Sequence, residues 1–180
     1  MFKNKVIVIT GSTQGIGFKT AEMLLNRGAR VVINSRSPEK VTNALNSFEK
    51  FSPNVIGLAG DVSNYEFCIA LREFAIKKFG QIDILINNAG VASSGLLKES
   101  VPDALEKVIN INLLGSIYPT MACLNDICKR RGSILFISSV AGIIGLPNYS
   151  QYSATKRAVI SLAESLKSEL IDYGVFVGIN

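Results

Sequence analysis

The 180-residue chain contains no histidine, and this absence excludes catalytic arrangements that depend on an imidazole. Neither a Ser-His-Asp triad nor a Cys-His pair can form, and the lack of histidine also argues against a metal site of the zinc type. Acid–base chemistry therefore falls to tyrosine, lysine, carboxylate or cysteine side chains. The three cysteines, Cys68, Cys123 and Cys128, form no C-x-x-C pair, which predicts reduced thiols in a cytoplasmic protein.

Membrane-spanning apolar runs, low-complexity tracts and long charge runs are also missing. No membrane span is expected, and residues 1–5 lead directly into a strand-like run, which leaves no room for a secretory leader. The formal net charge of +5 is spread along the chain. Its one cluster, Lys129-Arg130-Arg131 before Gly132, is typical of a helix end, with a nucleic-acid patch as the alternative. We expect no nucleic-acid partner, because an anionic cofactor is a sufficient use for this charge.

Strand-like and helix-like segments alternate along the chain. The β-branched run at residues 5–10 predicts a buried strand. Further strands are expected at 30–33, 54–59, 82–86, 133–137 and 175–179. Helices are expected at 18–27, 38–50, 65–79, 102–131 (interrupted near Gly115 and Pro119) and 148–173. This alternation predicts an α/β fold, with one Rossmann-type doubly wound parallel sheet over residues 1–180.

A glycine-rich turn, Gly11-x-x-x-Gly15-x-Gly17, lies between the first expected strand and the first expected helix. Glycines there let the backbone approach a pyrophosphate, whose charge a helix N-terminus favours. The spacing differs from the usual G-x-G-x-x-G, and a purely structural turn is the alternative. The turn predicts dinucleotide binding, through Gly11, Ser12, Thr13, Gly15, Ile16 and Gly17.

The second expected strand ends in Asn34-Ser35-Arg36. A carboxylate at this place binds the ribose hydroxyls of NAD, whereas an arginine accommodates the 2′-phosphate of NADP. Arg36 therefore favours NADP(H), with a solvated loop arginine as the alternative. Asp61 and Asn88 follow the third and fourth strands, where they would meet the adenine and the ribose, although both residue types are also ordinary turn formers.

Tyr152 and Lys156 stand four residues apart, so on a helix they share one face, one turn apart. Ser139 lies just past the fifth expected strand, at the edge where open α/β sheets place their ligands. A phenol beside an ammonium, with a hydroxyl facing them, can give a proton to a carbonyl oxygen and hold that oxygen as it becomes an alkoxide. A polar helix start without catalytic use is the alternative.

Taken together, these stretches resemble the classical short-chain dehydrogenase/reductase family. The resemblance covers the whole chain and follows the family order: Thr10-Gly11-x-x-x-Gly15-x-Gly17, Asn87-Asn88-Ala89-Gly90, Ser139 and Tyr152-x-x-x-Lys156. It implies that Asn112 completes a catalytic tetrad with Ser139, Tyr152 and Lys156. It further implies cofactor contacts by Ser35 with Arg36, Asp61 with Val62, Asn88 to Gly90, Tyr152 and Lys156.

The resemblance implies an NADP-dependent oxidoreductase acting on a small-molecule carbonyl/alcohol pair. Tyr152 would protonate the substrate oxygen, Ser139 would hydrogen-bond it, and Lys156 would stabilise the phenolate and hold the nicotinamide ribose. Asn112 would anchor a water that passes protons to Lys156.

One feature departs from the family pattern. Family chains continue past the sixth strand into a substrate-covering loop, a helix and a seventh strand, so the chain resembles a family member truncated after Asn180. Two alternatives follow: a non-catalytic fragment that keeps the scaffold, and a nucleotide-binding regulator. The resemblance also implies a homodimer or homotetramer that pairs the helices expected at 102–131 and 149–173.

Overall fold

Six parallel strands form the centre of the computed structural model, which describes residues 2–180. Met1, which belongs to the N-terminal segment in which no secretory leader was expected, lies outside the described residues. The strands are β1 (Val6–Ile9), β2 (Arg30–Ser35), β3 (Val55–Ala59), β4 (Ile84–Asn87), β5 (Ser133–Phe136) and β6 (Phe176–Ile179). They pair in the order β3-β2-β1-β4-β5-β6. The predicted doubly wound Rossmann-type sheet is confirmed, and its switch point between β1 and β4 is where such sheets open a ligand crevice.

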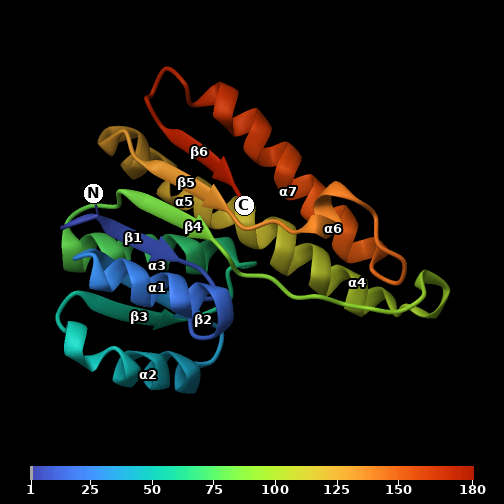
Figure 1. Cartoon of the computed structure of the whole chain (residues 1–180), viewed down its shortest axis with the longest axis horizontal. Coiled ribbons are helices and arrows are strands. Elements are labelled where there is room, and N and C mark those ends of the chain that lie inside the picture. The colour runs from blue at the N-terminus through green and yellow to red at the C-terminus, as the bar shows by residue number, and fades with distance from the viewer. Residues whose placement is uncertain (1) are drawn as a thin grey trace.

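Helices pack on both faces of this sheet (Figure 1). The helices α1 (Gly15–Asn26) and α2 (Pro38–Ser47) pack on one face, and α3 (Tyr65–Phe79), α5 (Gly115–Arg130) and α7 (Ser150–Glu169) on the other. Side chains alternate between the faces of a strand. Ile7 and Ile9 of β1 accordingly pack with α1 and α2, whereas Val8 packs with α3 and α5.

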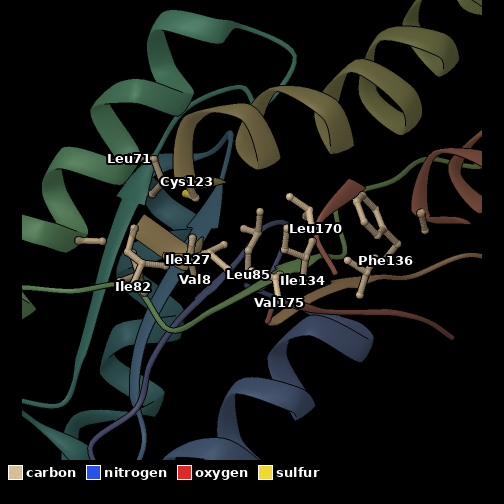
Figure 2. Packing of buried hydrophobic residues seen from close by; sticks show 14 of the residues in the cluster. Val8, Leu71, Ile82, Leu85, Cys123, Ile127, Ile134, Phe136, Leu170 and Val175 are labelled. Atoms are coloured by element: carbon tan, nitrogen blue, oxygen red, sulfur yellow. The ribbon is translucent and has the colours of Figure 1, made fainter. Parts of the chain in front are cut away.

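The larger core cluster lies between the sheet and α3, α5 and α7 (Figure 2). Leu71 of α3 and Ile127 of α5 pack with Val8, Leu85 and Ile134, which lie on three neighbouring strands. All five side chains are at most 1% exposed. Because tight packing resists local movement, this layer holds the carboxyl ends of β1, β4 and β5 in fixed relative positions.

The predicted bounds of α3 are confirmed at both ends. Asn64 precedes the helix and its side chain accepts a hydrogen bond from the backbone N–H of Phe67 at 2.9 Å, which is the usual N-cap arrangement. Gly80 ends the helix with φ +77°, a left-handed conformation that favours glycine.

The segment predicted as one long helix over 102–131 is divided into α4 (Pro102–Ile109), a π-helical turn at Asn110–Leu114, and α5. The expected break near Gly115 is confirmed, but the break expected near Pro119 is wrong, because α5 runs through that residue. The i→i−4 bond that Pro119 cannot make would fall on Gly115. Since Gly115 directly follows the π-helical turn, the missing bond coincides with a break that already exists.

Other segments also differ from the prediction. The helix expected at 38–50 ends at Ser47 and is followed by a separate 3₁₀ turn. The loop expected after β5 contains the short helix α6 (Val140–Ile143). The last helix was expected to reach Tyr173, but α7 ends at Glu169 and residues 170–174 continue as tighter turns. Short 3₁₀ turns lie at Glu49–Phe51 and Leu97–Glu99. Within residues 2–180, none of the helices combines the length and the apolar character needed to cross a membrane.

Candidate active site

A cavity of about 340 Å³ opens at the switch point, beyond the carboxyl ends of β1 to β4. Most of the residues predicted to bind a cofactor line it: Gly11, Thr13, Gly15, Ile16, Ser35, Arg36, Asp61, Val62, Asn88, Ala89 and Gly90. The predicted residues Ser12, Gly17, Tyr152 and Lys156 are not part of this lining. The cavity therefore unites segments that are up to 100 positions apart, as Gly11 and Ile111 are.

The glycine-rich turn packs so closely against the loop after β4 that two glycines leave no room for a side chain. Gly11 has φ +60°, and a Cβ there would lie 2.8 Å from the Cα of Ala89. A Cβ on Gly17 would lie 2.5 Å from Nδ2 of Asn88. Gly15, in contrast, faces open space at the start of α1. The turn thus offers bare backbone beside a helix N-terminus, as a bound pyrophosphate requires.

Ser12 is fully buried and its hydroxyl is engaged inside the scaffold. It donates to the carbonyl of Ile9 at 2.6 Å and accepts from the backbone N–H of Asn34 at 3.0 Å. The side chain of Asn34, which sequence reasoning left without a role, donates to the carbonyls of Leu58 and Gly60. Together these two residues tie the ends of β1, β2 and β3 to one another. The only sign of this role of Asn34 in the sequence was that a polar residue stands at the end of an apolar strand.

Asn88 also holds the cavity wall in place. Its Nδ2 donates to the carbonyls of Thr10 and Gly11, both at 2.9 Å. The Thr10 hydroxyl accepts from the backbone N–H groups of Asn88 and Ala89, both at 3.0 Å. Because its amide nitrogen points at the glycine-rich turn, Asn88 fixes the distance between this turn and the loop after β4.

The far corner of the cavity, at the end of β2, carries two cations. Arg36 and Lys40 both line it and are both exposed. The ammonium of Lys40 donates to Oε1 of Gln14 in the glycine-rich turn at 3.1 Å. Asp61 lines the same cavity, and one of its carboxylate oxygens accepts from the backbone and the hydroxyl of Ser63. Lys40, which sequence reasoning missed, follows Arg36 by four residues.

Ser139, Tyr152 and Lys156 come from the end of β5 and the first turns of α7. Lys156 is only 5% exposed, and its ammonium donates to the carbonyl of Ile137 at 2.8 Å, two residues before Ser139. The same nitrogen lies 5.9 Å from the centre of the Tyr152 ring. Burial lowers the pKa of Lys156. The hydroxyl oxygen of Ser139 accepts from the backbone N–H of Ala141 at 3.2 Å, so that its O–H remains to donate elsewhere.

Asn112 lies in the π-helical turn and is fully buried. Its Oδ1 accepts from the N–H of Val91 at 2.8 Å, and its Nδ2 donates to the carbonyl of Val91 at 3.0 Å. The same Nδ2 donates to the hydroxyl of Thr155 at 3.1 Å. A Cβ on Gly90 would lie 3.4 Å from Oδ1 of Asn112 and 3.5 Å from Nζ of Lys156. Asn112 and Lys156 thus meet at Gly90, which lines the cavity, and Asn112 also contacts Thr155, a residue that sequence reasoning missed.

A family model described as short chain dehydrogenase matches residues 5–179. The chain is 37% identical to a 3-dehydrosphinganine reductase of Danio rerio over 177 residues, which cover 95% of this chain and 53% of that protein. The chain therefore spans about half the length of this relative.

Two solved structures have the same fold and carry different cofactors. A short chain dehydrogenase/reductase from Burkholderia phymatum in complex with NAD has a TM-score of 0.93 and 31% sequence identity, covering 99% of this chain and 64% of that one. ElxO with NADP bound has a TM-score of 0.92 and 34% identity, covering 97% and 71% respectively.

Proposed function

Because the chain belongs to the short-chain dehydrogenase/reductase family, we propose that it forms the catalytic part of an NADP(H)-dependent oxidoreductase that acts on a carbonyl/alcohol pair. The observation that carries this proposal is the placement of the Tyr152 ring 5.9 Å from the ammonium of Lys156. That ammonium is anchored at the carboxyl end of β5, beside the cavity whose glycine-rich wall suits a pyrophosphate. When bound, the nicotinamide supplies the hydride, and the protein supplies orientation and charge.

The proton chemistry is assigned to Tyr152 and Lys156. The phenol hydroxyl gives its proton to the substrate oxygen as the carbonyl carbon is reduced, and takes a proton back in the oxidative direction. A cation one turn away stabilises the phenolate that remains after this transfer. Lys156 can also hold the nicotinamide ribose, since an ammonium has three donors and the carbonyl of Ile137 occupies one of them.

Ser139 is assigned to the substrate oxygen. Its backbone is extended, with φ −165°, and its hydroxyl oxygen caps α6 by accepting from Ala141. Because that contact uses an acceptor site of the oxygen, the O–H group is free to donate. A hydroxyl oriented in this way stabilises negative charge on a substrate oxygen as it becomes an alkoxide.

Steady-state oxidation of NADPH with a panel of ketones and aldehydes tests this function. We expect turnover with at least one class of carbonyl compound and no turnover without NADPH or NADH. Tight NADPH binding without turnover of any carbonyl would instead favour a nucleotide-binding regulator. The name of the Danio rerio relative makes a long-chain keto compound a sensible member of the panel.

The cofactor proposal depends on Arg36, because one solved relative carries NAD and another NADP. We expect NADPH to bind more tightly than NADH, and Arg36→Ala to reduce that preference by about tenfold. Removing a charged hydrogen bond to a phosphate has an effect of this order when solvent screens part of it. Fluorescence titration of both nucleotides measures the ratio. NADH affinity should stay nearly constant, and equal affinities in the unaltered protein would refute the preference.

A homodimer or homotetramer is proposed as the assembly, with α4, α5 and α7 at the interface. Ile109 of α4 is 45% exposed and Met121 of α5 is 53% exposed, so these helices present apolar side chains that a second copy can cover. Sedimentation at micromolar concentration should show a dimer or tetramer, and Met121→Lys should shift it toward the monomer. A monomer at all concentrations would contradict the proposal.

A cytoplasmic location stays a prediction of the sequence.

A further inference from the structure

Thr155 lies between Tyr152 and Lys156 and is 4% exposed. Its hydroxyl makes two hydrogen bonds. It donates to the carbonyl of Tyr152 at 2.8 Å and accepts from Nδ2 of Asn112 at 3.1 Å. The donor and one acceptor site of this hydroxyl are therefore both engaged.

These two bonds extend a chain of contacts that begins in the loop after β4. Val91 exchanges two hydrogen bonds with the amide of Asn112, at 2.8 and 3.0 Å. Asn112 contacts Thr155, and Thr155 contacts the backbone of Tyr152. Two residues before Val91 in this loop, Ala89 packs against the glycine-rich turn, within 2.8 Å of where a Gly11 Cβ would be. The chain thus connects the wall of the cofactor cavity to the first turn of α7.

We propose that Thr155 is a positioning residue, whose hydroxyl fixes the first turn of α7, and with it the phenol of Tyr152, relative to the loop after β4. The inference rests on the proposed oxidoreductase function. The side-chain amide of Asn112 is fully buried, so the N–H group that bonds to Thr155 cannot turn to water if Thr155 loses its hydroxyl. Asn112 then shifts or leaves a donor unpaired, and the Tyr152 backbone loses its tie to the cavity wall.

The test compares Thr155→Val, which removes the hydroxyl at constant volume, with Thr155→Ser, which keeps it. In NADPH-dependent carbonyl reduction, we expect Thr155→Val to lower kcat by about tenfold or more, since small displacements of a reacting group have effects of this size. The Kd for NADPH should change by less than about twofold. Thr155→Ser should restore kcat to within about threefold. If Thr155→Val does not fold, Thr155→Ala carries the same expectation.

Thr120 provides a matched control on α5. It is 4% exposed, accepts from the amide of Asn87 at 2.8 Å and donates to the carbonyl of Ser116 at 2.8 Å. Thr120→Val therefore removes an equivalent pair of hydrogen bonds, one accepted and one donated, without touching Tyr152. We expect its Tm to fall about as much as that of Thr155→Val, with kcat within about twofold of the unaltered protein.

Three results would overturn the inference: an unchanged kcat in Thr155→Val, no rescue by Thr155→Ser, or an equal loss of kcat in Thr120→Val. The third result would mean that kcat merely follows the stability of the fold. Absence of turnover in the unaltered protein is a different failure. It would refute the proposed function, and the positioning role with it.

Discussion

Tyr152→Phe is expected to lower turnover by about 10²–10⁴-fold, the range typical for loss of a general acid or base, while NADPH binding stays within about twofold. The substitution removes one oxygen atom and keeps the ring. That ring has defined neighbours: the Tyr149 ring at 6.3 Å in an edge-on arrangement and the Lys156 ammonium at 5.9 Å. Because phenylalanine preserves these contacts, a loss of activity would report the missing proton donor. Stopped-flow or steady-state NADPH oxidation with the best substrate of the panel measures it.

Tyr149→Phe is the matched control for this prediction. Tyr149 stands three residues before Tyr152, and its ring packs edge-on against that of Tyr152. Removing its hydroxyl should leave turnover within a few-fold of the unaltered protein. If Tyr152→Phe also stays within a few-fold, Tyr152 is not the acid, and if Tyr149→Phe shows the larger loss, the assignment belongs to Tyr149.

Asp83→Asn is expected to reduce the free energy of unfolding by about 2–4 kcal/mol. Asp83 is 1% exposed and accepts from four donors. One oxygen accepts from the backbone N–H of Val6 at 2.9 Å and from Gln81 at 2.6 Å. The other accepts from Lys5 at 2.9 Å and from Arg130 at 3.3 Å. An asparagine can satisfy only one of these two sets, because its NH₂ group would face donors on the other side.

The same carboxylate predicts the acid dependence of stability. Burial alone would raise the pKa of Asp83, but the hydrogen bonds from Val6, Lys5 and Gln81 outweigh it and leave the pKa below its usual value. A carboxyl whose pKa is lower in the folded state stabilises the fold above its unfolded pKa of about 4. That stabilisation is lost as the pH falls from about 4 through the folded pKa.

Urea unfolding between pH 7 and pH 3 checks both statements about Asp83. The unaltered protein should lose stability steeply below about pH 4, and Asp83→Asn should start lower at pH 7 and show a flatter slope. Asp172→Asn, at an exposed position after α7, should change stability by less than about 0.5 kcal/mol. Equal stability of Asp83→Asn and the unaltered protein at pH 7 would show that the four contacts do not stabilise the fold.

The sequence alone was sufficient for features that depend on neighbours along the chain. The β-branched run before the glycine-rich turn predicted β1, and Gly80 predicted the end of α3, because helix-ending and turn conformations are local. The spacing of Tyr152 and Lys156 predicted that they share a helix face, since 3.6 residues make one turn. Alternation of strands and helices was enough for the parallel doubly wound sheet.

Only the tertiary structure decided which polar groups from distant segments of the chain meet. Asn112 and Thr155 are 43 positions apart, and Val6 and Asp83 are 77 apart. No periodicity relates such residues, because their contact depends on how strands and helices pack and on the rotamers that packing allows. The same holds for Ser12, which looks like a loop residue in the sequence but is fully buried in the fold. Local chemistry thus determined the elements and the residue types at the site, whereas packing between distant segments determined their hydrogen-bond partners and their burial.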